Sequence, residues 1–424
     1  MSNCAIVGIN WGDEGKGRMV DLLTQDYDVV VRYQGGGNAG HTVVNEQGKF
    51  ALHLLPSGIF RKGVVNILGN GVALDCESLW AEITNVTGKG VSITPENLKI
   101  SDRASLLLPW HRDLDGLEEA RLKDKKYGST KQGIAPFYSD KYQKKTIMAG
   151  ELLYPDKLWD RLADILEWKN LILTKVYGAK PYTMDDMKAW VADYGEKIKP
   201  FICDTGAFLR KANKEGKSIL FEAQLGSLRD LDYGIYPMTT SSNPIAAYAP
   251  VGSGYPEAKI DKVVGVVKAY SSCVGEGPFT CEWFGEEAEK LRDAGAEYGA
   301  KTGRPRRVGP IDIVATRYGI QCQGATDIAL TKLDVLSYMD EIPVCAHYEL
   351  RGEQTDEFPF PSLLPEAKPV METLPGWKCD ISGVRKWEDL PKEARDYVEY
   401  VERQVGCRIT YVSVGPERDS IIIR

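Results

Sequence analysis

A glycine-rich segment with one lysine and two carboxylates lies close to the start of the chain. Its sequence is Gly12-Asp13-Glu14-Gly15-Lys16-Gly17-Arg18. Glycines let successive backbone N–H groups point at one anion, and a lysine adds positive charge, so phosphate is the expected ligand. A carboxylate within such a loop can hold a cation or act as a base, which makes Asp13 a candidate for both roles. The alternative to a phosphate site is a glycine-rich turn that only connects a strand to a helix.

This segment departs from the common P-loop pattern at both ends. Asn10 stands where the first glycine belongs, and Gly17 follows the lysine in place of Ser or Thr. A magnesium ion bound to the phosphates would therefore lack its usual hydroxyl ligand. Asp13 could supply an oxygen in its place.

A second glycine-rich segment contains one of the four histidines of the chain. It reads Gln34-Gly35-Gly36-Gly37-Asn38-Ala39-Gly40-His41-Thr42. Most isolated histidines are structural, but a histidine in this loop could lie against the phosphate loop and act there. We predict that the two loops follow neighbouring parallel strands and face one crevice, where open parallel sheets bind ligands.

Later motifs point to a nucleotide. The densest basic stretch is Gly299-Ala300-Lys301-Thr302-Gly303-Arg304-Pro305-Arg306-Arg307. It lies in a loop of an acidic chain, which favours a focused anion site. Thr331-Lys332-Leu333-Asp334 follows an apolar run. At a strand end, an aspartate can accept hydrogen bonds from the N1–H and 2-amino groups of guanine, whereas adenine offers no such pair of donors. Ser413-Val414-Gly415-Pro416 could close the base pocket.

Two polar segments leave alternatives open. Residues 128–136 carry hydroxyl groups and a lysine between glycines, which suits either a solvated linker or a phosphate contact. Thr239-Thr240-Ser241-Ser242-Asn243 precedes an expected helix, where one of these side chains would serve as an N-cap. A cap accounts for only one of the five.

Apolar runs and helical spacing provide the framework that positions these loops. The expected strands are 4–9, 29–33, 50–55, 64–68, 98–101, 218–222, 262–269, 328–330 and 409–412. The expected helices are 19–24, 75–86 and 110–122, followed by a helix-rich region over 151–215.

Composition bounds the possible functions. The 424 residues carry a net charge of −7, from 53 basic and 60 acidic side chains, which argues against a broad nucleic-acid surface. We find no apolar run of about 18 residues and no leader, so we expect a soluble protein without a membrane partner. The nine cysteines are scattered singly, which favours reduced thiols in the cytoplasm.

Several motifs together resemble the adenylosuccinate synthetase family. They are Trp-Gly-Asp-Glu-Gly-Lys-Gly at 11–17, Gln-Gly-Gly-Gly-Asn-Ala-Gly-His at 34–41, Thr-Ser-Ser-Asn at 240–243, Thr-Gly-Arg-Pro-Arg-Arg at 302–307, Thr-Lys-Leu-Asp at 331–334 and Ser-Val-Gly-Pro at 413–416. The resemblance covers essentially the whole chain. It implies an α/β fold with a large, mostly parallel central sheet, flanking helices and a phosphate loop related to that of GTP-binding proteins. We expect one catalytic domain over 1–424 with a helix-rich insertion around 109–215.

The resemblance also implies an activity. Members of this family are ligases of purine biosynthesis that join L-aspartate to IMP at the expense of GTP and work as homodimers with Mg²⁺. By resemblance, Asp13 takes the N1 proton of IMP, so that O6 attacks the γ-phosphate of GTP. His41 stabilises and protonates the transferred phosphoryl group, and Lys16 neutralises phosphate charge. Magnesium would contact Asp13 and the Gly40 carbonyl.

The remaining site residues follow from the same resemblance. The residues expected to contact GTP are Gly12, Asp13, Glu14, Gly15, Lys16, Gly17, Arg18, Gly40, His41, Thr42, Arg306, Lys332, Leu333, Asp334, Ser413, Val414 and Gly415. Those expected to contact IMP are Asp13, Glu14, Gly15, Lys16, Asn38, Ala39, Gly40, His41, Thr130, Lys144, Gln224, Thr240 and Arg304. Those expected to bind aspartate are Gly299, Ala300, Lys301, Thr302, Gly303 and Arg304.

The chain departs from the family pattern in three places. Lys301 precedes Thr302 where the family often has two threonines, which affects the first hydroxyl contact to aspartate. The common Gly-Ala-Gln-Gly is here Ala223-Gln224-Leu225-Gly226, which moves the glutamine by one place. Gln143-Lys144-Lys145 stands where the partner subunit usually lends an arginine to the IMP phosphate. A lysine makes a point-charge contact and not a bidentate one, so we predict weaker cross-subunit binding.

Two other functions compete with this interpretation. A ligase of the same fold could use another purine monophosphate, although an acidic base at position 13 suits hypoxanthine N1. A GTP-binding switch would explain the phosphate loop and Thr-Lys-Leu-Asp. It would leave His41 and the basic loop without a role.

Overall fold

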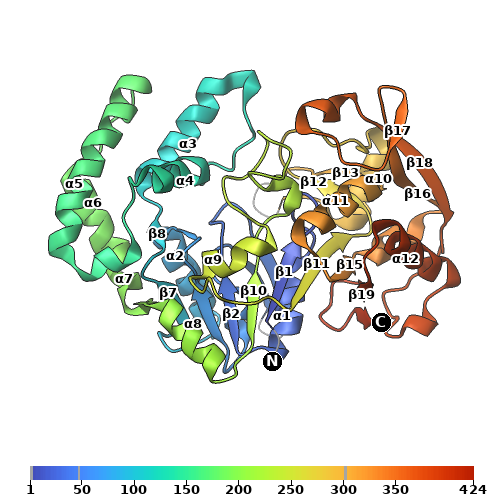
Figure 1. The fold of residues 1–424 in the computed structure, drawn as a ribbon, viewed down its shortest axis with the longest axis horizontal. Helices are drawn as coiled ribbons and strands as arrows, with labels where there is room; N and C mark the ends of the chain where they lie inside the picture. Colours follow the sequence, from blue (N-terminus) through green and yellow to red (C-terminus); the bar gives the residue numbers. More distant parts are fainter. Residues whose placement is uncertain (1–2, 46–47, 300–302) are drawn as a thin grey trace.

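The computed structural model describes residues 3–45, 48–299 and 303–424 (Figure 1). A ten-stranded sheet runs through its centre in the order β20-β19-β15-β11-β1-β10-β2-β5-β7-β9. All neighbours are parallel except β20, which is antiparallel to β19. The expected large, mostly parallel sheet is therefore confirmed. Its strands are β1 (Cys4–Gly8), β2 (Val29–Arg32), β5 (Val65–Leu68), β7 (Leu98–Ser101), β9 (Ile202–Cys203), β10 (Ile219–Glu222), β11 (Lys262–Lys268), β15 (Asp327–Thr331), β19 (Ile409–Ser413) and β20 (Ile421–Ile423).

Apolar residues fill both faces of the central strands. Along β1, Ala5 and Val7 belong to one hydrophobic cluster, whereas Cys4 and Ile6 belong to another. Successive side chains of a strand point to opposite faces, so the two clusters lie on opposite sides of the sheet. This double burial explains why the strands read as continuous apolar runs instead of alternating ones.

Helices surround this sheet, and the smaller strands form separate pairings. The helices are α1 (Lys16–Leu23), α2 (Cys76–Gly88), α3 (Pro109–Leu122), α4 (Ile134–Gln143), α5 (Pro155–Leu171), α6 (Met184–Trp190), α7 (Glu196–Ile198), α8 (Thr205–Lys214), α9 (Ala249–Ser253), α10 (Gly285–Gly295), α11 (Ile313–Gln323) and α12 (Lys392–Val405). The other strands are β3 (His41–Asn45), β4 (Gly48–Leu52), β6 (Ala73–Leu74), β8 (Ser105–Leu106), β12 (Ser271–Cys273), β13 (Arg307–Gly309), β14 (Ile311–Asp312), β16 (Glu341–Leu350), β17 (Glu353–Thr355) and β18 (Lys368–Pro375). Among the helices of the described ranges, none combines the length and hydropathy that a bilayer span requires.

The helix-rich region gathers at one side of the molecule. Figure 1 shows α3 to α7 together there, while β16 to β18 and α12 lie at the opposite side. Leu158, Leu162 and Ile165 are buried on the inward face of α5, at the spacing that the sequence indicates. The chain then returns through β9 to the edge of the central sheet, beside β7.

Two expectations about local structure are wrong, and a third is confirmed only in part. The strands β1 and β2 are not neighbours, because β10 pairs with both and lies between them. The strand expected over 50–55 is present as β4, but it spans Gly48–Leu52 and pairs with β3 in a two-stranded sheet outside the central one. No side chain of 239–243 caps the next helical turn, which starts at Ala246 with Ile245 at its N-cap.

Candidate active site

The phosphate loop, residues 10–18, follows β1 and includes the first turn of α1. The backbone φ angles of 105° at Gly12 and 101° at Gly15 lie in the left-handed region, where a side chain would be strained. α1 begins at Lys16, so the positive end of its dipole and its first N–H groups lie at this loop. The loop is therefore built to receive an anion.

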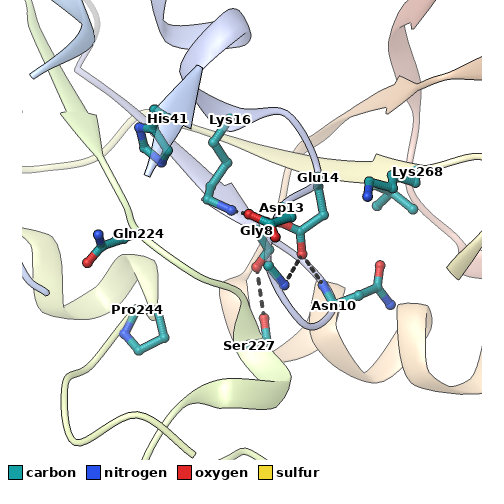
Figure 2. A network of polar contacts seen from close by, with 12 residues as sticks. Gly8, Asn10, Asp13, Glu14, Lys16, His41, Gln224, Ser227, Pro244 and Lys268 are labelled. Atoms are coloured by element: carbon teal, nitrogen blue, oxygen red, sulfur yellow. Dashed lines mark hydrogen bonds and ion pairs between the residues drawn. The ribbon is translucent and has the colours of Figure 1, made fainter. Parts of the chain in front are cut away.

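Glu14 supports the loop from within. Its carboxylate accepts hydrogen bonds from the N–H groups of Asn10 at 3.2 Å and Gly12 at 2.8 Å. The Lys16 ammonium pairs with the same carboxylate at 2.6 Å, and both side chains are buried. Figure 2 shows Lys16 reaching Glu14 inside the loop, with His41 beside it. Glu14 thus fixes the position of the lysine charge.

His41 packs directly on the start of α1. A Cβ atom at Gly17 would lie 2.5 Å from the Cβ of His41, so only glycine fits at that position. Nδ1 of His41 lies 2.5 Å from Oε1 of Glu222, and the buried Nε2 has no hydrogen-bond partner within the described protein. Burial lowers the pKa of His41 and outweighs the opposing effect of Glu222. Burial also raises the pKa of Glu222, but the hydrogen bond from His41 and the nearby charges prevail and the net pKa is lowered.

Gln224 occupies the space between the phosphate loop and the second glycine-rich loop. Its amide nitrogen donates to the carbonyls of Gly36 at 2.8 Å and Ala39 at 2.7 Å, and its Oε1 accepts from the N–H of Gly36 at 3.0 Å. Because β10 separates β1 from β2, this residue after β10 joins the two loops. The side chain holds the second loop in the conformation that presents Asn38 and His41.

Asp13 takes part in a charged cluster through Arg306. The Arg306 guanidinium lies 3.1 Å from Asp13 and 2.7 Å from Glu297. The fully buried Glu297 also receives Lys268 at 2.8 Å and Lys332 at 3.1 Å. Burial raises the pKa of Glu297, but these three cations outweigh it and hold the pKa well below its usual range. The cluster places the basic loop and Lys332 beside the phosphate loop.

The Thr-Lys-Leu-Asp motif meets the same loop. The Thr331 hydroxyl donates to the Glu14 carbonyl at 2.7 Å, and Lys332 takes the left-handed φ of 60° that begins the short helix at Leu333–Tyr338. Burial raises the pKa of Asp334, whose carboxylate is half-buried. Leu333 is buried. The motif therefore lies where a base could follow a phosphate chain bound at the loop.

Arg18 connects α1 to the segment expected to close the base pocket. Its guanidinium donates to the Ser413 hydroxyl and to the Gly415 carbonyl, both at 2.5 Å. Burial lowers the pKa of Arg18 to about 10. Val414 is buried between these two contacts.

The residues expected to hold IMP are spread over several loops. Asn38 is half-buried and its Oδ1 has no hydrogen-bond partner in the described protein, and the Thr240 hydroxyl lies 3.3 Å from that of Ser242. Thr130 and Lys144 are exposed, and Lys144 ends α4 in a left-handed conformation.

The aspartate loop is described only in part. Ala300, Lys301 and Thr302, like the side chain of Thr42, lie outside the described residues. Gly303 is exposed, and Gly299 accepts a backbone hydrogen bond from Gly303 at 2.8 Å. The exposed Arg304 lies 3.4 Å from Glu276.

Sequence reasoning missed three charged residues of this site, Glu222, Lys268 and Glu297. Glu222 and Lys268 each end an apolar strand at the edge where the loops gather. A buried charged residue at the carboxyl end of a parallel strand is a signal that could have identified both. Glu297 lies just before the basic loop and carries no comparable signal.

The loop offers oxygen ligands that suit magnesium. Across the described ranges no three His, Cys, Asp or Glu side chains gather as a metal-binding group. Mg²⁺ usually binds one or two carboxylates together with substrate phosphates, so a full protein cage is not needed. The partly exposed Asp13 carboxylate and the exposed Gly40 fit that donor set.

Known proteins with similar sequences and structures agree with one another. The family model of adenylosuccinate synthetase matches residues 5–422. The adenylosuccinate synthetase of Streptococcus gordonii is 45% identical over 420 residues, covering 99% of this chain and 97% of that protein. That of Bifidobacterium adolescentis is 45% identical over 423 residues, covering 100% and 98%.

Two solved structures are similar in fold. A fully ligated adenylosuccinate synthetase from Plasmodium falciparum gives a TM-score of 0.93 at 34% identity and covers 100% of both chains. A succinoaminodeoxyadenylate synthetase of cyanophage S-2L, bound to dGMP and dATP, gives 0.64 at 21% identity and covers 100% of this chain and 95% of that one. The second likeness concerns the fold alone. The family match over nearly the whole chain and the full-length relatives show that the chain belongs to the adenylosuccinate synthetase family of ligases.

Proposed function

We propose that this chain joins L-aspartate to IMP at the expense of GTP and releases adenylosuccinate, GDP and phosphate. The observation that carries the proposal is the meeting of Asp13, Lys16 and His41 at one phosphate loop, where Nε2 of His41 is buried and has no hydrogen-bond partner in the described part of the chain. A GTP-binding switch without an acceptor substrate would not need that imidazole or the basic cluster around Glu297.

The proposed reaction has two steps. Asp13 accepts the N1 proton of IMP while O6 forms a bond to the γ-phosphorus of GTP and the bond to GDP breaks. Lys16 and His41 offset the charge that develops on the transferred group, which is the main requirement of such transfers. The amine of aspartate then attacks C6 of 6-phosphoryl-IMP, the C6–O bond breaks, and phosphate leaves with the proton that the amine gives up. Phosphate is a far better leaving group than the original oxygen.

Asp13 and the Gly40 carbonyl would hold magnesium beside the phosphates. When bound, the ion would neutralise negative charge on GTP. Arg306 would compete with magnesium for the Asp13 carboxylate, because the side chains of Arg306 and Asp13 lie 3.1 Å apart. Movement of Arg306 toward GTP would leave the carboxylate available for the N1 proton.

Substrate contacts are assigned by the same proposal. GTP would lie on 12–18, Arg306, Lys332–Asp334 and 413–415, with Gly40, His41 and Thr42 over its γ-phosphate. IMP would contact the phosphate loop, Asn38–His41, Thr130, Gln224, Thr240 and Arg304. Aspartate would bind to 299–304. Residues 1–424 would form one catalytic domain with a helix-rich insertion around 109–215, located in the cytoplasm, where its nine free thiols would stay reduced.

Release of phosphate from GTP tests the function directly. We expect release only when IMP and aspartate are both present, with adenylosuccinate absorbance appearing at the same rate. Release from GTP alone would favour a switch and overturn the proposal. Release that needs aspartate and a purine monophosphate other than IMP would identify a ligase with a different substrate.

A mixture of subunits tests the homodimer and the role of Lys144. If Lys144 enters the partner's site, a Lys144→Ala subunit paired with an Asp13→Ala subunit forms one doubly damaged site and one intact site. Co-expression of equal amounts should give about one quarter of the wild-type rate plus about one quarter of the rate of Lys144→Ala alone, because about half of the dimers are mixed and each has one intact site. A rate equal to the mean of the two parent variants would rule out a shared site.

A further inference from the structure

Glu222 is a fully buried carboxylate directly behind His41. It ends β10 with 0% of its surface exposed, and its Oε1 lies 2.5 Å from Nδ1 of His41. Ser57 donates to it twice, through its N–H to Oε2 at 2.8 Å and through its hydroxyl to Oε1 at 2.7 Å. The carboxylate is thus fully occupied by two neighbours, one of which is the candidate catalytic histidine.

This contact links two separate sheets. His41 begins β3, which belongs to a two-stranded sheet with β4, whereas Glu222 belongs to the central sheet. The orientation of the imidazole is therefore determined by a bond to the rigid sheet and by its packing on Gly17. The opposite ring atom, Nε2, has no hydrogen-bond partner among the residues that the structure describes.

We propose that Glu222, supported by Ser57, is a positioning residue that fixes the ring orientation and the tautomer of His41. An ionised carboxylate only accepts hydrogen bonds, so Nδ1 must carry a proton. Nε2 is then the atom that faces the substrate. It takes up a proton there before it can donate to the transferred phosphoryl group, while the Nδ1 proton stays in its hydrogen bond to Glu222. This inference rests on the proposed role of His41, but the state of the ring is measurable without any turnover.

The Glu222→Gln variant tests this inference, because it should reverse the tautomer of His41. The backbone N–H of Ser57 is fixed and can only donate, so it requires the amide oxygen at the place of Oε2. The amide nitrogen then occupies the place of Oε1 and donates to Nδ1 of His41. The ring proton is forced from Nδ1 to Nε2, although the variant keeps the size and hydrogen-bond count of the original side chain.

Nitrogen-15 NMR of the substrate-free protein reads the tautomer. Only four histidines are present in the chain, so the His41 ring can be assigned by a His41→Gln variant. We expect a protonated Nδ1 in the wild type, a protonated Nε2 in Glu222→Gln, and the wild-type pattern in Ser57→Ala, which keeps the carboxylate. Identical His41 spectra in the wild type and Glu222→Gln would overturn the inference.

Kinetics provide the second readout. We expect kcat of Glu222→Gln to fall about 10- to 100-fold, as is typical when the group that orients a histidine is changed, while the KM values for GTP and IMP stay close to those of the wild type. Asp140→Asn is the control for loss of a buried carboxylate beside a histidine, because buried Asp140 lies 2.8 Å from Nε2 of His111 and also pairs with buried Lys169, in a cluster far along the chain from the phosphate loop. Because this variant also breaks the ion pair with Lys169, it overstates a merely structural effect. An equal fall in kcat in both variants would assign Glu222 a merely structural role. Failure of the wild type to ligate aspartate would refute the proposed function and leave the NMR result standing.

Discussion

The Asp13→Asn variant is expected to lose turnover by about 10²- to 10⁴-fold, the usual contribution of a general base, while still binding GTP and IMP. The amide keeps the shape of the side chain but cannot accept the N1 proton, so O6 of IMP stays a poor nucleophile. The folded structure should persist, because Arg306 keeps its 2.7 Å contact with Glu297 when its 3.1 Å contact with position 13 is weakened. The measurement is single-turnover phosphate release at saturating GTP, IMP and aspartate.

A matched carboxylate away from the loop provides the control. Asp340 is exposed and pairs with Lys378 at 3.1 Å, so Asp340→Asn should leave the rate unchanged. A rise in the KM for GTP or IMP with an unchanged single-turnover rate would contradict a proton-accepting role. In that case Asp13 would serve only to bind a ligand or a cation.

Local sequence was sufficient to find the loops, because their chemistry depends on adjacent residues. Left-handed φ angles at Gly12 and Gly15 need glycine, and an anion site at a helix start needs little else. The strands near them were equally predictable, since burial on both faces makes each one a short apolar run. Their bounds agree with expectation within a residue or two at 29–33, 218–222 and 409–412.

Spatial order was not predictable from the same patterns. β10 follows β2 by almost two hundred residues in the chain. Nothing in its apolar run indicates that it would lie between β1 and β2 in the sheet. The partners that this order creates were missed for the same reason. Glu222 reaches His41, and Gln224 reaches Gly36, only because β10 lies in the middle. Charged groups such as Glu297 depend on contacts among three loops and have no local signature.

We predict that exchanging one side-chain atom of residue 334, the proposed contact to the base, changes the nucleotide preference. Guanine presents two donors, N1–H and the 2-amino group, to a carboxylate at Asp334. Xanthine keeps N1–H but has an acceptor oxygen at C2, which a carboxylate would repel. An amide at this position offers one acceptor and one donor, so Asp334→Asn should prefer XTP over GTP.

The expected effect is large because the site is half-buried. The carboxylate of Asp334 is partly removed from water, and this burial raises its pKa. A base whose polar groups do not match residue 334 would leave a polar group at this position without a hydrogen-bond partner. We expect kcat/KM for GTP to fall about 10²-fold or more and kcat/KM for XTP to rise above it, with ATP unused by either protein. The measurement compares the three nucleotides at fixed IMP and aspartate.

Asp380 is the matched control, since this exposed carboxylate acts on Asp334 only through space and accepts a hydrogen bond from the N–H of Ser382 at 2.8 Å. Asp380→Asn should keep the preference for GTP. If Asp334→Asn lost activity with GTP and XTP alike, the carboxylate would support the loop instead of reading the base. A selective exchange of nucleotides, by contrast, has no structural explanation other than direct hydrogen bonding between residue 334 and the purine edge.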